Sequence, residues 1–366
     1  MLIDGKWMCG VWIETDGWSV GIIDQTKLPH AVNTLRLATL ADVVHAISSM
    51  QTRGAPVIGA VAAYGLCLAL RVDPSDAALE HAYATLVATR PTAVNLKWGL
   101  DEIVAAVRNQ PRGERVAAAY ARAAAICRED IANNEAIGRH GLAVIECIAA
   151  AKAFGARVNV LTHCNAGWLA TVDWGTATAP IYKAHLKGLP VHVWVDETRP
   201  RNQGASLTAW ELGHQGVPHA VIADNTGGHL MQHGLVDLVI TGADRVTAQG
   251  DVCNKIGTYL KALAAQDNGV PFYAAMPSST IDFALGDGLA DIPIEQRGPE
   301  EVATMTGRTA DGRIETVTVV PDGSPVANYA FDVTPARLVT GLITERGVIA
   351  ATCESLATSF PERARQ

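Results

Sequence analysis

The chain has 366 residues, of which 49% are hydrophobic and 18% are charged, and its formal net charge is −8. This length favours two domains with room for a cleft that excludes water, and the composition predicts no long disordered region. Because acidic and basic residues are interspersed and form no basic stripe, we expect no nucleic-acid partner.

The cysteines and the apolar segments bear on the cellular compartment. The seven cysteines are dispersed and never occur in C-x-x-C spacing, which argues against a disulfide framework and a structural zinc site. Residues 1–10 have neither a basic nor an apolar signal region, so a cytoplasmic protein is expected. The most apolar stretch, Ala55 to Leu70, is shorter than the roughly 20 residues of a membrane-spanning helix, which predicts a buried helix and no membrane partner.

The first half of the chain reads as a small antiparallel β unit followed by helices. Between Trp7 and Asp24, β-branched and aromatic residues alternate around Asp16-Gly17, which predicts a hairpin. Apolar residues at helical spacing then predict five helices, separated by Pro, Gly and Asn residues. Their expected ranges are Leu40 to Met50, Pro56 to Leu70, Pro74 to Thr89, Val94 to Val107 and Glu114 to Ile131.

From about Asn134 short β-branched runs alternate with helical stretches, which predicts a parallel, Rossmann-like sheet. The runs are Val158 to Leu161, Val191 to Val195, Ala220 to Ala223, Val236 to Ile240 and Phe272 to Ala275. We therefore expect an α/β protein with a smaller, mainly helical N-terminal domain over residues 1–133 and a Rossmann-like catalytic domain over residues 134–366. In such sheets ligands bind beyond the carboxyl ends of the strands.

A cysteine follows the first of these strands. Val158 to Leu161 leads into Thr162-His163-Cys164-Asn165-Ala166-Gly167, which places the Cys164 thiol on a turn among small residues. A thiol in that position suits a nucleophile or a general acid-base, whereas most cysteines are small buried hydrophobic residues. Both interpretations stay open for this motif alone.

An aspartate follows another predicted strand. Val236 to Ile240 leads into Thr241-Gly242-Ala243-Asp244-Arg245, so Asp244 is expected to face the same crevice as Cys164. A loop aspartate that caps a helix or pairs with Arg245 is the ordinary alternative, and only the combination with Cys164 favours catalysis. Burial would raise the pKa of such a carboxyl group, which suits proton transfer near neutral pH.

Three segments are candidates for binding a phosphate. The run from Gly250 to Thr258 predicts a helix that begins near Asn254, whose free N–H groups favour an anion beside Lys255. Thr52-Arg53-Gly54-Ala55-Pro56 precedes a helix with proline in its first turn, and Arg90-Pro91-Thr92 repeats this pattern. For each segment alone, a surface lysine or arginine is the ordinary alternative.

A polar segment, Asp196-Glu197-Thr198-Arg199-Pro200-Arg201-Asn202-Gln203-Gly204, follows the strand Val191 to Val195. Its hydrogen-bonding groups suit the recognition of hydroxyls, and Gln203 offers both a donor and an acceptor to a sugar. A charged surface loop, with Asp196 holding Arg199 or Arg201, is the alternative.

Taken in this order, the segments resemble the methylthioribose-1-phosphate isomerase family, which is related to regulatory subunits of the translation-initiation exchange factor and to ribose-1,5-bisphosphate isomerases. The resemblance covers nearly the whole chain, and the joint order of its motifs is highly specific. It rests on Arg53-Gly54-Ala55-Pro56, Arg90-Pro91-Thr92-Ala93-Val94-Asn95, Thr162-His163-Cys164-Asn165-Ala166-Gly167, Asp196-Glu197-Thr198-Arg199-Pro200, Gly242-Ala243-Asp244-Arg245, Asn254-Lys255-Ile256-Gly257-Thr258 and Phe331-Asp332-Val333-Thr334-Pro335.

The resemblance implies a homodimer with no metal and no cofactor, and it implies that Cys164 and Asp244 are the catalytic pair. The residues that it implies for substrate binding are Arg53, Gly54, Ala55, Arg90, Gln203, Asn254 and Lys255. Three positions depart from the family pattern. Trp168 stands where a small residue is usual, Cys253 where alanine is expected and Tyr329 where proline is expected. The bulk of Trp168 bears on which group the sugar substrate carries at its carbon 5. An apolar group beside Trp168 is the better match.

The implied reaction converts 5-methylthioribose 1-phosphate to 5-methylthioribulose 1-phosphate, an aldose-ketose isomerisation in methionine salvage. Because the phosphate blocks simple ring opening, the ring oxygen must be protonated, for which Asp244 is the candidate. Hydrogen then moves from C2 to C1, either as a proton taken by a Cys164 thiolate or as a hydride. A low-pKa thiolate near cationic groups slightly favours the proton route.

Other substrates and a role without catalysis stay as alternatives. The substrate alternatives are 5-deoxyribose 1-phosphate and ribose 1,5-bisphosphate, although no additional cationic cluster for a second phosphate is readable. A non-catalytic regulatory subunit is the other alternative, against which the pairing of Cys164 with Asp244 argues. A nicotinamide dehydrogenase is disfavoured, since no G-x-G-x-x-G turn follows Val158 to Leu161.

Overall fold

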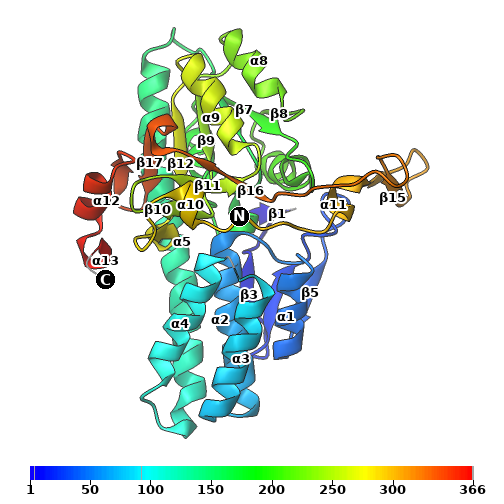
Figure 1. Cartoon of the computed structure of the whole chain (residues 1–366), viewed down its shortest axis with the longest axis vertical. Coiled ribbons are helices and arrows are strands. Elements are labelled where there is room, and N and C mark those ends of the chain that lie inside the picture. The colour runs from blue at the N-terminus through cyan, green and yellow to red at the C-terminus, as the bar shows by residue number, and fades with distance from the viewer. Residues whose placement is uncertain (4, 92, 365–366) are drawn as a thin grey trace.

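The computed structural model describes residues 1–3, 5–91 and 93–364, so Thr92 of the Arg90-Pro91-Thr92 motif lies outside the described residues. An antiparallel β unit and four helices form the lower part of the molecule in Figure 1, and a parallel sheet with its helices forms the upper part. The predicted α/β class, with a helical N-terminal region and a Rossmann-like sheet, is therefore confirmed.

The N-terminal part begins with two small antiparallel sheets. They are formed by β1 (Leu2–Ile3) with β2 (Lys6–Trp7), and by β3 (Val11–Ile13), β4 (Val20–Ile23) and β5 (Thr34–Leu37). The pairing of Val11 with Ile22 and of Ile13 with Val20 confirms the predicted hairpin. Four helices follow, namely α1 (Leu40–Ser48), α2 (Ala55–Val72), α3 (Asp76–Thr89) and α4 (Val94–Val107), each close to its predicted range.

Helix α2 is the centre of the helical part and packs against α1, α3, α4 and the following helix α5 (Arg112–Ala150). Among the described residues, α2 is the one helix long and apolar enough to cross a membrane by length and composition, and 72% of it is buried inside the structure. The expectation of a buried core helix over Ala55 to Leu70 is therefore confirmed.

Helix α5 is 39 residues long and continues well past its predicted end at Ile131. The predicted change of pattern falls at about Asn134, but Asn134 is fully buried within α5, which packs against α2 and α4 as well as against elements of the C-terminal part. Tertiary packing on both sides thus offsets the low helix propensity of asparagine. The predicted domain boundary between residues 133 and 134 falls inside α5, and the division into two domains stays a prediction.

The C-terminal part is built on a seven-stranded sheet. Its strands, in spatial order, are β18 (Gly347–Ile349), β17 (Gly341–Thr344), β12 (Phe272–Ala275), β9 (Leu238–Thr241), β6 (Val158–Thr162), β7 (Val191–Asp196) and β8 (His219–Ile222). All neighbours pair in parallel except β17 with β18. Apolar side chains such as Val160, Val193 and Ile240 are fully buried, as expected for strands covered on both faces.

Helices α6 (Ala179–Leu186), α7 (Ala209–His214), α8 (Thr226–Gln232) and α9 (Thr258–Asp267) connect the strands. A four-stranded sheet lies beside them, in the order β13 (Ile281–Asp282), β10 (Arg245–Thr247), β11 (Val252–Lys255) and β16 (Phe331–Thr334). The remaining short helices are α10 (Gly288–Asp291), α11 (Glu300–Ala303), α12 (Cys353–Ser359) and α13 (Pro361–Ala364).

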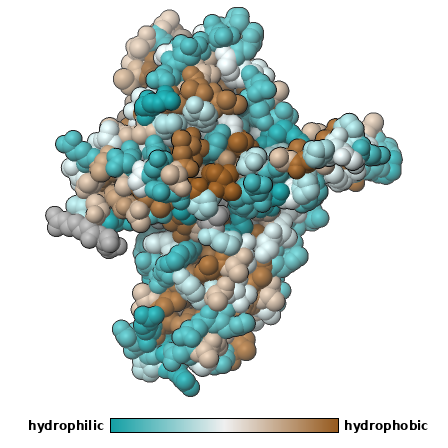
Figure 2. All heavy atoms as spheres, viewed as in Figure 1, coloured by the Kyte–Doolittle hydropathy of each residue, from teal (hydrophilic) through white to brown (hydrophobic). Residues whose placement is uncertain are grey.

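A hairpin of β14 (Thr304–Arg308) and β15 (Ile314–Thr318) projects from the body of the molecule at the right of Figure 1. The space-filling view of the same face shows hydrophobic and hydrophilic residues mixed along this hairpin (Figure 2). Met305, Ile314 and Val317 are among its exposed apolar side chains.

Candidate active site

Cys164 and Asp244 follow two neighbouring strands of the large sheet. Strand β6 pairs in parallel with β9, with Val160 opposite Leu238 and Leu161 opposite Val239. Because paired parallel strands end at the same edge, the turns that follow them lie side by side, and the side chains of Cys164 and Asp244 line one cavity. The predicted shared crevice is therefore present in the structure.

This main cavity lies between the two parts of the molecule and holds about 650 Å³ of space, counting its open mouth. All nine predicted site residues line it, namely Arg53, Gly54, Ala55, Arg90, Cys164, Gln203, Asp244, Asn254 and Lys255. Other lining residues include Met50, Pro56, Ala166, Ala170, Thr171, Thr176, Pro277 and Phe331.

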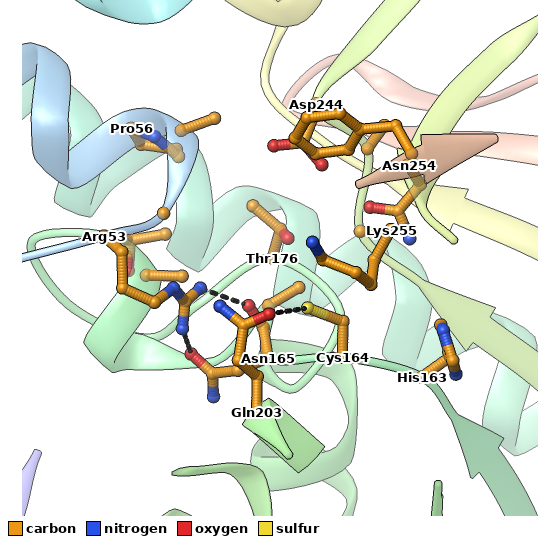
Figure 3. A pocket seen from close by; sticks show the side chains of 18 of the residues that line it. Arg53, Pro56, His163, Cys164, Asn165, Thr176, Gln203, Asp244, Asn254 and Lys255 are labelled. Atoms are coloured by element: carbon orange, nitrogen blue, oxygen red, sulfur yellow. Dashed lines mark hydrogen bonds between the residues drawn. The ribbon is translucent and has the colours of Figure 1, made fainter. Parts of the chain in front are cut away.

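The Cys164 turn is held by hydrogen bonds from both sides. The residue has a positive φ of 65°, which is unusual for a residue with a side chain. Its backbone N–H donates to Thr198 Oγ1 at 2.8 Å, and its carbonyl oxygen accepts from Thr208 Oγ1 at 2.7 Å. The thiol donates to Gln203 Oε1 at 3.5 Å and faces the cavity (Figure 3). The thiol is thus held in a defined direction by the loop that follows β7.

The charges around Cys164 do not produce a low-pKa thiolate. Burial raises the pKa of Cys164, and the nearby cations Arg53 and Lys255 offset only part of this effect. The sequence-based expectation of an activated thiolate is therefore wrong, because desolvation of the thiolate outweighs its attraction to the cations. A neutral thiol is the form that this environment favours.

Asp244 is held by its backbone and keeps its carboxyl group directed into the cavity (Figure 3). Its N–H donates to the carbonyl oxygen of Cys253 at 2.9 Å. Burial raises the pKa of Asp244, although Lys255, Arg90 and Arg53 act in the opposite direction. The expectation of a carboxyl group with a raised pKa is confirmed, and a group of this kind is suited to donate a proton.

Asn254 and Lys255 line the cavity, but not as the start of a helix. They belong to β11, where Asn254 lies opposite Asp332 and Lys255 opposite Phe331 of β16. Helix α9 begins only at Thr258, and the Asp332 carboxylate accepts hydrogen bonds from Gly257 N at 2.7 Å and Tyr259 N at 3.1 Å. The predicted anion site at this helix start is therefore wrong, because a carboxylate of the protein already occupies it.

Lys255 brings a buried cation into the cavity. Its ammonium lies 4.8 Å from the centre of the Phe331 ring, and burial lowers its pKa while Cys164 and Asp244 oppose that effect. No carboxylate among the described residues pairs with this ammonium at ion-pair distance. Lys255 thus remains available to an anion bound in the cavity.

The start of helix α2 forms the opposite wall. Gly54 is its N-cap with a φ of 112°, and the first turn has no capping side chain, so its N–H groups are open to an anion. A Cβ atom on Gly54 would lie 2.4 to 2.6 Å from atoms of Ala170. Glycine is therefore required here by both the backbone conformation and the close approach of the Ala170 loop.

Arg90 lies at the end of a helix rather than at the start of the next one. It follows the last residue of α3, and α4 begins four residues later at Val94. The prediction that Arg90 stands at the start of a helix is therefore wrong. Its side chain reaches the cavity from the C-terminal end of α3. Its guanidinium reaches the cavity wall and pairs with Glu295 at 3.2 Å.

A buried glutamate, Glu211, organises the turn behind Cys164 and is not apparent from the sequence. Glu211 accepts hydrogen bonds from Trp168 N at 3.0 Å, Leu169 N at 2.9 Å, Tyr182 Oη at 2.8 Å and Asn165 Nδ2 at 3.0 Å. Burial raises the pKa of Glu211, and these donors oppose that effect. The one available signal was a lone glutamate between Trp210 and Leu212 in an apolar run.

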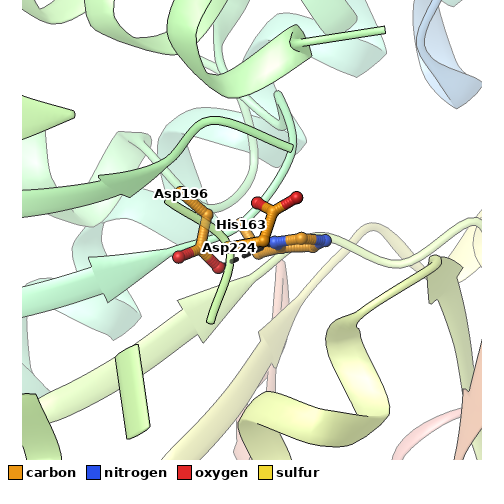
Figure 4. Close-up of side chains that lie close together, drawn as sticks. All are labelled: His163, Asp196 and Asp224. Atoms are coloured by element: carbon orange, nitrogen blue, oxygen red, sulfur yellow. Dashed lines mark hydrogen bonds and ion pairs between the residues drawn. The ribbon is translucent and has the colours of Figure 1, made fainter. Parts of the chain in front are cut away.

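His163, Asp196 and Asp224 form the one group among the described residues whose side chains are close enough to hold a metal ion (Figure 4). His163 Nδ1 lies 2.8 Å from Asp196 Oδ2, and its Nε2 lies 2.8 Å from the carbonyl oxygen of Ile256. The ammonium of Lys261 contacts Asp196 Oδ2 at 3.2 Å and donates to the Asp224 carbonyl oxygen. A lysine of the protein thus supplies the positive charge. Through His163 the group joins the turn that carries Cys164 to the segment that follows β11.

Trp168 does not line the main cavity. Its side chain is fully buried and packs near Trp210, with ring centroids 6.1 Å apart, in the core beneath the sheet. The expected contact between Trp168 and a 5-substituent is therefore wrong, because the turn after Cys164 directs this side chain inward. The other two departures from the family pattern are Cys253 and Tyr329. Cys253 is buried beside Asp244, and the side chain of Tyr329 is 51% exposed to solvent.

A side cavity opens from the main cavity next to Asp244. The two share Gly54, Ala55, Arg90, Asp244 and Phe331. Beyond this opening the wall is mostly apolar and is formed by Ile58, Ala93, Cys253, Ile292 and Pro293, together with Arg245. Arg245 forms an ion pair with Asp282 at 3.6 Å.

The chain is similar to known proteins over its full length. A family model described as the Initiation factor 2 subunit family matches residues 51–351. The chain belongs to this family. Within it, a protein from Rhodospirillum centenum named methylthioribose-1-phosphate isomerase is 64% identical over 366 residues, which cover 100% of this chain and 97% of the relative.

Two solved structures of family members share the fold. The 5-methylthioribose 1-phosphate isomerase from Pyrococcus horikoshii OT3 matches with a TM-score of 0.83 at 40% identity, covering 98% of this chain and 97% of that one. The translation initiation factor eIF-2B subunit delta from A. fulgidus matches with a TM-score of 0.79 at 35% identity, covering 97% and 100%.

Proposed function

We propose that this chain is a methylthioribose-1-phosphate isomerase, an aldose-ketose isomerase that produces 5-methylthioribulose 1-phosphate. The observation that carries the proposal is a carboxyl group of raised pKa, Asp244, facing the same cavity as the Cys164 thiol beside three cations. The isomerases named among the family members, at 40 to 64% identity over nearly the whole chain, support it. A subunit that only binds a partner has no need for this pair.

The phosphate is expected to bind among Arg90, Lys255 and the first turn of α2. Arg90 and Lys255 both line the cavity, and so do Gly54 and Ala55 at the start of α2, which has no capping side chain. Anions are favoured at such a helix start and by charge-assisted hydrogen bonds from arginine and lysine. C1 of the sugar carries the phosphate, so this arrangement would place C1 near Arg90 and Lys255. The rest of the sugar would then extend toward Asp244.

Ring opening requires an acid, and Asp244 is the proposed donor. Its protonated carboxyl gives a proton to the ring oxygen, the bond from C1 to that oxygen breaks, and the oxygen becomes the 4-hydroxyl group. The electron-poor C1 that results is stabilised by the attached phosphate oxygen. The same step leaves Asp244 as a carboxylate, which is then the base for the second half of the reaction.

Hydrogen transfer is proposed to proceed as a hydride shift. Hydrogen moves with its electron pair from C2 to C1, and the O2 hydroxyl gives its proton to the Asp244 carboxylate as the C2 ketone forms. This route regenerates the starting acid and needs no thiolate. It therefore agrees with the raised pKa of Cys164, whose neutral thiol, held by Gln203, shapes the site at C2.

The side cavity supports an apolar 5-substituent. It begins at Asp244, and its far wall is formed by apolar side chains such as Ile58, Ile292 and Pro293. A second phosphate would have to lose its hydration among these groups, and Arg245 is already paired with Asp282. A methylthio group has no such cost, so 5-methylthioribose 1-phosphate is favoured over ribose 1,5-bisphosphate.

Turnover of a panel of pentose 1-phosphates tests the proposal. The purified chain is incubated with substrates that carry a 5-methylthio, 5-deoxy or 5-phosphate group, and ketose formation is followed for each. We expect the highest kcat/KM for the 5-methylthio compound and the lowest for the bisphosphate. Absence of turnover for the whole panel would instead favour a regulatory subunit.

The same proposal includes a role in methionine salvage, a cytoplasmic location and a homodimer. Sedimentation of the purified chain tests whether it is a dimer.

A further inference from the structure

Arg90 is held by weaker hydrogen bonds than the other arginine of the cavity, Arg53. Its Nη2 donates to Glu295 Oε2 at 3.2 Å, its Nη1 donates to the sulfur of Met50 at 3.2 Å, and its buried Nε has no partner among the described residues. Arg53 donates from its two terminal nitrogens to oxygen atoms of Asn165 at 2.5 and 2.7 Å. Arg90 therefore keeps an unused Nε donor and a sulfur contact that a stronger acceptor can replace, while Glu295 holds its Nη2.

Glu295 is itself fixed by an ion-pair chain. Glu295 Oε1 lies 2.8 Å from Arg297, whose guanidinium contacts Glu301 at 2.8 Å, and Glu301 pairs with Arg201 at 2.9 Å. The backbone of Glu295 is also held, since its carbonyl oxygen accepts from Ala330 N at 3.0 Å, next to the cavity wall. Glu295 would thus remain in place if Arg90 turned toward a bound phosphate.

The charge of Glu295 also acts on Asp244. Cationic Lys255, Arg90 and Arg53 all lower the pKa of Asp244, whereas Glu295 raises it together with burial. These charged groups act on Asp244 from β11, the end of α3, the start of α2 and the segment between α10 and α11. Cys164 and Cys253 lie nearby as thiols. Glu295 is therefore the anion that offsets the cations of the phosphate site.

We propose that Glu295 is a positioning residue that holds Arg90 at the cavity wall and balances its charge, so that a phosphate-binding arginine and the acid Asp244 can share one cavity. The inference rests on the proposed function, in which Arg90 binds the phosphate and Asp244 is the acid. Glu295 reduces the affinity for the phosphate and in return keeps Asp244 in its acidic form.

The variant Glu295→Gln tests this balance, because glutamine can still accept a hydrogen bond from Arg90 but carries no charge. Glu300→Gln removes the same charge from an exposed position on the same segment and is the matched control. Inorganic phosphate binding is measured by calorimetry, and kcat and KM are measured from pH 6 to 9. The side chains of Arg90 and Glu295 are only 13% and 21% exposed, so removal of the Glu295 charge should tighten phosphate binding by roughly fivefold.

The expected kinetic signature separates charge balance from a loss of structure. Without Glu295 the pKa of Asp244 in the free enzyme falls, so kcat/KM should decline at a lower pH than in the unaltered enzyme or in Glu300→Gln, while KM decreases. Weaker phosphate binding with a kcat/KM loss that is equal at every pH would show a structural role only and overturn the inference. Behaviour equal to that of Glu300→Gln would overturn it as well.

The two proposals can fail independently. If the unaltered chain turns over no pentose 1-phosphate, the proposed function fails, yet calorimetry with inorganic phosphate still reports whether Glu295 restrains Arg90. If turnover is present and the Glu295→Gln profile does not move, the proposed function stands and the role of Glu295 is refuted.

Discussion

The Arg53 guanidinium donates to both polar oxygens of Asn165, to Oδ1 at 2.5 Å and to the carbonyl oxygen at 2.7 Å. Arg53 precedes the first turn of α2 in the cavity wall, and Asn165 follows Cys164 directly, so this pair links the helical part to the turn that carries Cys164. Both residues are buried, at 6% and 3% exposed. The bidentate contact explains why an arginine rather than any cation is suited to this position.

Replacing Arg53 by lysine should therefore impair the enzyme while keeping the charge. A lysine ammonium cannot donate to both oxygens of Asn165 in the same geometry, and hydrogen bonds of charged groups contribute about 1.5 to 3 kcal/mol. We expect kcat/KM for the 5-methylthio substrate to fall roughly 10- to 100-fold. Arg108→Lys, on the exposed end of α4, is the control and should leave kcat/KM unchanged. Equal kinetics for both variants would contradict the proposed link.

Cys164→Ser and Asp244→Asn should each fold and bind inorganic phosphate but lose turnover. General acid-base assistance contributes on the order of 10²- to 10⁴-fold, so Asp244→Asn should lose activity to that extent, and Cys164→Ser should lose most of it. Circular dichroism, phosphate calorimetry and turnover are measured on the same preparations. Cys353→Ser, an exposed free cysteine, is the matched control. Full activity in either site variant would remove that residue from the mechanism.

Substrate that carries deuterium at C2 separates the two routes of hydrogen transfer. Because burial raises the pKa of Cys164, we expect a direct hydride shift and complete transfer of the label to C1 of the product. Mass spectrometry and NMR of the product in ordinary water measure the retained label. Loss of deuterium to solvent would show that Cys164 removes a proton after all.

The 5-substituent is expected to be selected by the side cavity. Ile292→Asn places a polar amide in its apolar wall, which should lower kcat/KM for the 5-methylthio compound more than for ribose 1,5-bisphosphate. The ratio of the two kcat/KM values is the measurement, and we expect a shift of about tenfold. Leu289→Asn, 75% exposed on the same segment, should leave this ratio unaltered. A change shared equally by both substrates would speak against a role in selection.

Asp130 of α5 predicts a pH dependence of stability that is separate from catalysis. Burial raises the pKa of Asp130 to about 7, although its carboxylate accepts a hydrogen bond from Val172 N at 2.7 Å. In the unfolded chain an aspartate has a pKa of about 3.9, so the folded state binds the proton more tightly. The free energy of unfolding therefore falls as the pH rises from about 4 to 7, by up to about 4 kcal/mol.

Asp130→Asn should flatten this dependence, because asparagine still accepts from Val172 and does not titrate. Urea unfolding at pH 5 and pH 8 measures the effect, with Glu114→Gln at the exposed start of α5 as the control. If the difference between the two pH values is the same in Asp130→Asn as in the unaltered chain, another group is responsible.

Local patterns were sufficient to predict five strands of the large sheet, and since parallel strands end at one edge, they also placed Cys164 and Asp244 at one crevice. Strands β17 and β18 were not predicted, and the full set of cavity residues came from the family resemblance. Local patterns failed where distant pairing decides the structure. Asn254 and Lys255 pair with β16, almost 80 residues later, so a local helix signal was misleading. Glu211 and Glu295 were not found, since each gains its role from arginines, amides or backbone groups that only the fold brings near.

The continuous helix α5 has a mechanical consequence. With 39 residues it is a rod of about 58 Å, and it is packed against α2 and α4 near one end and against α6 and β17 near the other. Bending of the molecule at the middle of this rod would break backbone hydrogen bonds of α5, so the elements packed at its two ends keep a fixed separation. A proline in the middle of α5 should therefore disturb the packing at both ends.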